Sequence, residues 1–156
     1  MSSNSMLNKG TPGTGSVNDR QVGGSHYSLS AYQHWDYATD LNMRHVEGAA
    51  TKYLARAGNK QGESRYKDLE KTLHYLEKAL ELHKEGRLGA LADYQHGVST
   101  AAITARFIGA SLSGHAFTPN AVAALVLLGS WRNVEELEQA IKLVNIELNQ
   151  ATAKSI

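Results

Sequence analysis

Apolar side chains recur along most of the chain at intervals of three and four residues, which is the period of an α-helix. The clearest run covers residues 65–85, and Gly86 predicts its end because glycine readily adopts the left-handed conformation that closes a helix. No segment shows the period-two alternation of a strand, so the sequence predicts an all-α bundle of about five to six helices. The run at 65–85 is built on four leucines at steps of four, three and four, namely Leu69, Leu73, Leu76 and Leu80.

Other helices show the same period. Thr118 and Pro119 are typical of a helix start, because a threonine side chain accepts from the first turn and proline has no amide to satisfy there. Gly58 should stop the helix that precedes it. Helices are therefore expected over residues 30–40, 44–57, 118–128 and from 133 onward, with an Ala-rich helical segment over 90–112.

The first 26 residues differ in composition from the rest. They hold five glycines, five serines, a proline and no aromatic residue, so burial cannot offset the entropy of ordering them. The sequence predicts a flexible tail over 1–26 and a helical domain over 27–87. It also predicts a C-terminal helical region over 88–156, which either packs on that domain or mediates oligomerisation.

The charge of the chain is balanced overall but not locally. The formal net charge is +1, which argues against a broadly basic nucleic-acid-binding protein. Residues 44–87 carry ten basic and seven acidic side chains, whereas both flanks carry one more acidic than basic. An anionic ligand should therefore meet the middle third of the chain.

Several classes of protein are disfavoured. The chain has no cysteine, which excludes a disulfide scaffold, thiolate metal sites and a cysteine nucleophile. The start is polar and lacks the apolar core of a signal peptide. The most apolar run, residues 121–129, is too short to cross a bilayer. We therefore expect a cytoplasmic protein without a membrane partner.

Three cations gather around the end of the second expected helix. Lys52 and Arg56 lie one helical turn apart, and Lys60 follows in a glycine-containing loop. Arginine can grip phosphate oxygens with two hydrogen bonds, and lysine can act as a point charge. The segment predicts either a phosphate-binding site or an ordinary solvated basic face, on which alanine would be tolerated.

Carboxylates could complete such a site. Asp68 falls in the first turn of the helix over 65–85 and shares a face with Lys71 and Tyr75. Glu47 lies on the preceding helix. Two carboxylates facing cations can organise a divalent ion on a phosphate, or can simply be ion-pair partners of Lys52, Arg56 or Lys71.

Other catalytic patterns are missing from the sequence. The seven histidines have no zinc-binding spacing, no Gly-x-Ser-x-Gly nucleophile turn occurs, and residues 10–16 lack the lysine of a Walker loop. Arg106 lies in an apolar helix, where a cation needs a partner or contact with water. It is therefore expected to form a structural ion pair, to lie on a water-facing stripe, or to reach the phosphate site.

Four segments together resemble a known family. They are Gly23-Gly-Ser-His-Tyr27, Trp35-Asp-Tyr37, the run from Glu47 to Lys60 that contains Lys-Tyr-x-x-Arg-x-Gly-x-Lys, and Tyr66-Lys-Asp-Leu-Glu-Lys71. Over about residues 22–85 this chain is similar to a small bacteriophage family, long catalogued as a domain of unknown function. The family includes the phage deoxynucleoside monophosphate kinase that lacks a Walker loop. Residues 88–156 have no counterpart in the resemblance.

The resemblance implies a phage-encoded, oligomeric protein of the host cytoplasm. The implied activity is transfer of a phosphoryl group from a nucleoside triphosphate to a deoxynucleoside monophosphate, such as dTMP or dGMP. Any Mg²⁺ would accompany the nucleotide, and no tightly bound protein metal site is expected. The implied catalytic residues are Lys52, Arg56, Asp68 and His26, and the implied nucleotide-binding residues are Tyr27, Lys52, Tyr53, Arg56, Lys60 and Lys71.

Two other functions stay open. One is a non-catalytic protein that binds and sequesters a nucleotide. The other is a structural or interaction protein whose working surface is the apolar run at 121–128 together with the apolar face of the last helix.

Overall fold

The computed structural model describes residues 32–57, 64–88, 99–111 and 117–155. Six helices and no strand lie within these ranges, which confirms the predicted all-α bundle. The predicted tail over 1–26 and the loop after Gly58 lie outside the described residues. The helices are α1 (His34–Asp40), α2 (His45–Arg56), α3 (Arg65–Lys84), α4 (Thr100–Ser111), α5 (Pro119–Ser130) and α6 (Val134–Ser155).

Local sequence signals set several helix ends. The hydroxyl oxygen of Thr118 accepts from the Ala121 amide at 3.1 Å, and Pro119 is the first residue of α5, as predicted. Ser64 begins α3 in the same way, by accepting from the Lys67 amide. Gly86 has φ +69°, the left-handed conformation expected after α3.

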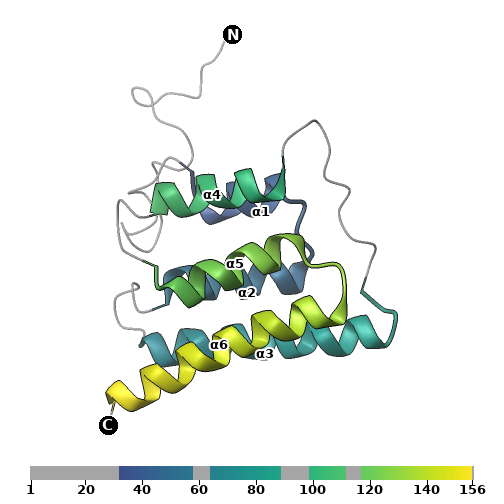
Figure 1. The fold of residues 1–156 in the computed structure, drawn as a ribbon. Coiled ribbons are helices and arrows are strands. Elements are labelled where there is room, and N and C mark those ends of the chain that lie inside the picture. Colours follow the sequence, from purple (N-terminus) through teal and green to yellow (C-terminus); the bar gives the residue numbers. More distant parts are fainter. Residues whose placement is uncertain (1–31, 58–63, 89–98, 112–116, 156) are drawn as a thin grey trace, which may run out of the picture.

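The helices form two layers of three (Figure 1). The first layer holds α1, α2 and α3, and the second holds α4, α5 and α6. Across the layers α1 contacts α4, α2 contacts α5, and α3 contacts α6. In each of these pairs the two helices run in opposite directions (Figure 1). We refer to α1–α3 as the N-terminal unit and to α4–α6 as the C-terminal unit.

Both units contribute to one main core. Leu54, Leu69 and Leu76 of the N-terminal unit belong to the same buried cluster as Leu125 and Leu137 of the C-terminal unit. Most apolar residues of α5 and α6 thus pack within the chain itself, whereas Val126 and Ile146 are exposed. A smaller cluster around α1 is formed by Tyr32, Tyr37, Leu41, Ala55 and Phe107.

Candidate functional site

The end of α2 and the start of α3 bring Arg56 and Asp68 together. Asp68 lies in the first turn of α3, where the helix dipole favours a carboxylate. Nε of Arg56 lies 3.4 Å from Oδ1 of Asp68. The Asp68 side chain is fully buried, and only 10% of the Arg56 side chain is exposed. This burial corrects the view of Lys52 and Arg56 as one solvated stripe, because α3 covers Arg56.

One oxygen of Asp68 has an unusual environment. Its Oδ2 atom is buried and has no hydrogen-bond partner within the described part of the chain. A buried polar atom without a partner costs about 1–3 kcal/mol, so such atoms are rare in folded proteins. Asp68 thus holds the Arg56 guanidinium through Oδ1, while its Oδ2 is enclosed within the fold.

Tyr53 sits among cations and a second aromatic ring. The Arg56 guanidinium carbon lies 4.6 Å from the centroid of the Tyr53 ring, and the Lys71 ammonium nitrogen lies 5.2 Å from it. Both distances are in the range of cation–π attraction. Tyr75 stacks on Tyr53 with 5.9 Å between centroids and 15° between planes. The structure thus brings four predicted site residues together: Tyr53, Arg56, Asp68 and Lys71.

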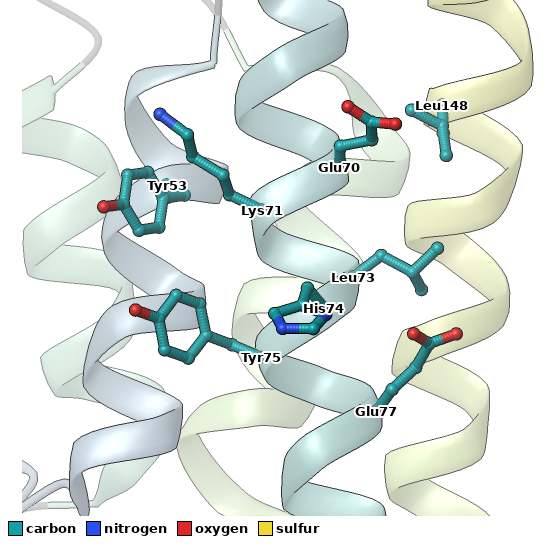
Figure 2. A pocket seen from close by; sticks show the side chains of 8 residues that line it. All are labelled: Tyr53, Glu70, Lys71, Leu73, His74, Tyr75, Glu77 and Leu148. Atoms are coloured by element: carbon teal, nitrogen blue, oxygen red, sulfur yellow. The ribbon is translucent and has the colours of Figure 1, made fainter.

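An open groove of about 610 Å³ adjoins this cluster (Figure 2). Lys71 and the two stacked tyrosines lie on its α2 side, and Leu148 of α6 lies on the other (Figure 2). The groove thus runs over α3 and begins at Lys71 and Tyr53. Its remaining lining residues are Glu70, Leu73, His74 and Glu77.

Lys52 is exposed on α2 and acts electrostatically on His34 of α1. Burial, followed by the positive charge of Lys52, lowers the pKa of His34 to about 4. The His34 ring is fixed by Thr51, whose Oγ1 lies 2.7 Å from its Nε2. Because Thr51 donates to the Glu47 carbonyl oxygen, it accepts from His34. Sequence reasoning missed His34, and its only signal was its place in the aromatic-rich segment before α2.

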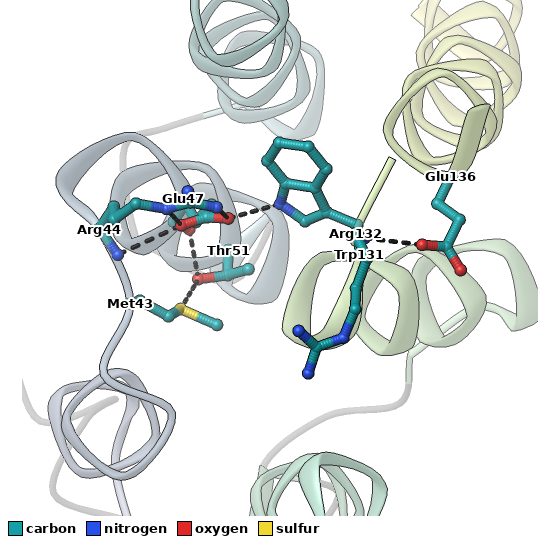
Figure 3. A network of polar contacts seen from close by, with 7 residues as sticks. All are labelled: Met43, Arg44, Glu47, Thr51, Trp131, Arg132 and Glu136. Atoms are coloured by element: carbon teal, nitrogen blue, oxygen red, sulfur yellow. Dashed lines mark hydrogen bonds and ion pairs between the residues drawn. The ribbon is translucent and has the colours of Figure 1, made fainter. Parts of the chain in front are cut away.

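Glu47 belongs to a different cluster at the other end of α2 (Figure 3). Both of its carboxylate oxygens accept from the Arg44 guanidinium, at 2.8 and 2.5 Å. The indole nitrogen of Trp131 donates to Oε2 at 2.5 Å. Glu47 is only 5% exposed, and its hydrogen bonds join α2 to the end of α5. Its described partners are thus Arg44 and Trp131, not the cations that the sequence offered.

The other predicted residues are placed as follows. Arg106 is exposed on α4, and its guanidinium carbon lies 4.1 Å from the centroid of the Tyr32 ring, in the α1–α4 layer pair. His26, Tyr27 and Lys60 lie outside the described residues. No cluster of three or more histidine or carboxylate side chains suited to a metal ion occurs within the described ranges. No described helix is both long enough and apolar enough to span a bilayer.

Comparisons with protein-family models, with curated proteins and with solved structures gave no match to this chain.

Proposed function

We propose that this protein binds a nucleotide through the cations around Tyr53 and transfers a phosphoryl group to a deoxynucleoside monophosphate. The observation that carries the proposal is the gathering of Arg56 and Lys71 on one tyrosine ring, with the buried carboxylate of Asp68 behind them. Both cations lie within cation–π distance of Tyr53, and phosphate is the anion that Arg and Lys side chains suit best.

Each residue has a role in this proposal. Lys71 and the exposed Lys52 neutralise phosphate charge, which is most of what phosphoryl transfer requires of a protein. Arg56 binds phosphate while Asp68 holds its guanidinium in place. The Tyr53–Tyr75 stack offers a surface for the base. Mg²⁺ would arrive with the nucleotide, and His26, Tyr27 and Lys60 retain the roles that the family resemblance implies.

One observation favours a protein that binds nucleotide without turning it over. Asp68 is completely buried, so its carboxylate is not at the surface that a ligand would contact. In that case Asp68 is a positioning residue for Arg56 alone. The interaction-protein alternative relied on the apolar residues of α5 and α6, and most of those residues pack in the core of the chain, whereas Val126 is 42% exposed.

A coupled assay separates the two nucleotide hypotheses. The protein is incubated with ATP, Mg²⁺ and dTMP or dGMP. Formation of the deoxynucleoside diphosphate, dTDP or dGDP, is measured together with the shift in melting temperature. Phosphoryl transfer gives product, whereas sequestration gives a shift without product. Folded protein that shows neither would overturn both.

The site is tested by replacing Lys52 and Lys71 with alanine. Lys52 is exposed and Lys71 is half-buried, so the double variant should keep its fold and lose its response to nucleotide. Lys78→Ala with Lys142→Ala is the matched control, because it removes the same charge from exposed positions away from Tyr53. An equal loss of the nucleotide response in the control variant would show that net charge, and not this site, controls binding.

A further inference from the structure

The two units of the fold repeat one another in order and direction. Each unit has three helices, and each helix of the first layer faces its counterpart of the second (Figure 1). All three pairs are antiparallel (Figure 1). This arrangement results when one unit is rotated by a half-turn onto the other about an axis between the layers.

The buried positions of α2 and α5 are in the same register. Every buried residue of α2 except Val46 has a buried counterpart 74 positions later, and the counterpart of Val46, Asn120, is partly exposed. The match includes the residue that follows each helix. The N-terminal set is Glu47, Ala50, Thr51, Leu54, Ala55 and Ala57, and the C-terminal set is Ala121, Ala124, Leu125, Leu128, Gly129 and Trp131.

The third helix of each unit repeats in the same way, now 68 positions apart. Two positions depart: the fully buried Asp68 corresponds to the partly exposed Glu136, and the buried Ala151 corresponds to the partly exposed His83. Two-fold pairing places the same surface of both partners in the interface, which explains why equivalent positions are buried in both units. The matching buried sets are Leu69, Thr72, Leu76 and Ala79 on α3, and Leu137, Ala140, Val144 and Glu147 on α6.

We propose that the chain is a fused pair of three-helix units, in which the C-terminal unit covers the N-terminal unit as a second copy of it would. The interaction surface of the N-terminal unit therefore fits a partner of its own kind, and the chain supplies that partner itself.

The candidate site is present on one unit only. Lys52, Tyr53 and Arg56 correspond to Val126, Leu127 and Ser130, and Lys71 corresponds to Gln139. Val126 is 42% exposed, so the C-terminal unit keeps an accessible face at the position of Lys52 but without its charge. Each chain should thus carry one such site and bind one ATP, not two. The prediction of a single site rests on the proposed function, whereas the paired architecture does not.

Distances between spin labels test the architecture without a ligand. The chain has no cysteine, so pairs of introduced cysteines can be labelled cleanly. The half-turn maps Lys52 onto Val126 and Glu70 onto Glu138, and all four side chains are exposed. The pair Lys52→Cys with Glu138→Cys should then give the same mean distance as Val126→Cys with Glu70→Cys.

A second pair of distances, also related by the half-turn, tests whether agreement in the first pair is a coincidence. Lys67→Cys with Ile146→Cys should match Lys78→Cys with Glu135→Cys, and these side chains are also exposed. Agreement within both comparisons supports the half-turn. A difference in either that exceeds the spread of the label's own conformations would overturn it.

Binding stoichiometry tests the single site, with ATP and Mg²⁺ as the probe in titration calorimetry. The wild-type chain should bind one ATP. Introducing the missing residues with Val126→Lys, Leu127→Tyr, Ser130→Arg, Gln139→Lys and Leu143→Tyr should raise this to two, since the counterpart of Asp68 is already the acidic Glu136.

The outcomes separate the two claims. Two ATP molecules on the wild-type chain, or a folded restored variant that still binds one, would overturn the single-site statement. A wild-type chain that binds no ATP would contradict the proposed function and the single site together, whereas the label distances would still decide the architecture.

Discussion

The Arg56–Asp68 pair shows how burial changes the meaning of a charged residue. Asp68 is fully enclosed, and Arg56 is its ion-pair partner at 3.4 Å. Removing one member of a buried pair leaves the other without compensation, which costs more than the pair itself contributes. Both the fold and the candidate site should therefore depend on the two residues as a pair.

A double-mutant cycle measures that dependence. Asp68→Asn and Arg56→Gln should each lower the free energy of unfolding by about 3–5 kcal/mol, because each leaves a buried charge without its partner. The double variant should lose clearly less than the sum of the two, since their partners are removed together. Urea unfolding of the four proteins gives the coupling energy. Strict additivity would show that the pair is not coupled.

His34 predicts a pH dependence of stability. Its folded pKa of about 4 lies below its ordinary value of 6.5, so between these values the unfolded chain binds a proton that the folded chain does not. Stability should therefore fall as the pH drops from 6.5 to 4, by up to about 3 kcal/mol. The free energy of unfolding, measured at several pH values over this range, should depend less on pH in His34→Gln than in the wild type. His74→Gln should keep the wild-type dependence, because its side chain is exposed. Equal pH profiles for wild type and His34→Gln would contradict the assignment.

At the level of single residues, the sequence predicted which side chains gather but not what surrounds them. Tyr53, Arg56, Asp68 and Lys71, which the structure brings together, follow from helical spacing or from the family resemblance. The burial of Arg56 depends on how α3 packs on α2, and the Glu47 hydrogen bond to Trp131 joins residues 84 apart in the chain. Contacts of that kind leave no periodic signal in a sequence.

At the level of helices, the close approach of α5 to α1 and α4 requires Gly129. A Cβ atom at this position would lie 3.0 Å from Thr104 Oγ1 and 3.2 Å from Leu41 Cδ1. Both neighbours are buried, so neither can move aside freely.

Gly129→Ala should therefore lower the free energy of unfolding by roughly 1–2 kcal/mol, because overpacking exceeds the gain in helix propensity. Gly109→Ala is the matched control on α4. A Cβ atom there meets nothing within 4 Å, and its substitution should stabilise the protein by about 1 kcal/mol. Thermal or urea unfolding of both variants checks that the two substitutions change the free energy of unfolding in opposite directions. Stabilisation by Gly129→Ala would refute the packing argument.

Helix existence could be predicted well from the sequence, because capping and periodicity are local properties. The Thr118-Pro119 start and the Gly86 stop both match the structure. The expected helix over 30–40 is described as the shorter α1, His34–Asp40. The pairing of helices across the two layers could not be predicted, since it depends on contacts between segments far apart in the chain.

At the level of the whole molecule, a second buried carboxylate ties the units together. Glu147 of α6 pairs with Arg65 of α3 and accepts from Thr118 Oγ1 at 2.6 Å. Arg65 also donates to the Ala57 carbonyl oxygen, at the end of α2. The start of α3 is thus fixed to both α2 and α6.

Because both units share one core, Glu147→Ala should weaken the entire molecule. The free energy of unfolding should fall by roughly 2–4 kcal/mol, somewhat below the cost for a fully buried pair since Arg65 can reach water. Circular dichroism in urea should show one transition at a lower midpoint with an unchanged slope. Two separate transitions would show that the units unfold independently.

The two tryptophans give the molecule an internal optical reporter. Trp35 is 51% exposed on α1, whereas Trp131 is 2% exposed and hydrogen-bonded to Glu47 of the opposite unit. A quencher dissolved in the buffer can collide with the indole of Trp35 in the folded protein but not with that of Trp131. Loss of protection at Trp131 would therefore mark the moment when the two units separate, and its fluorescence would follow that event in real time.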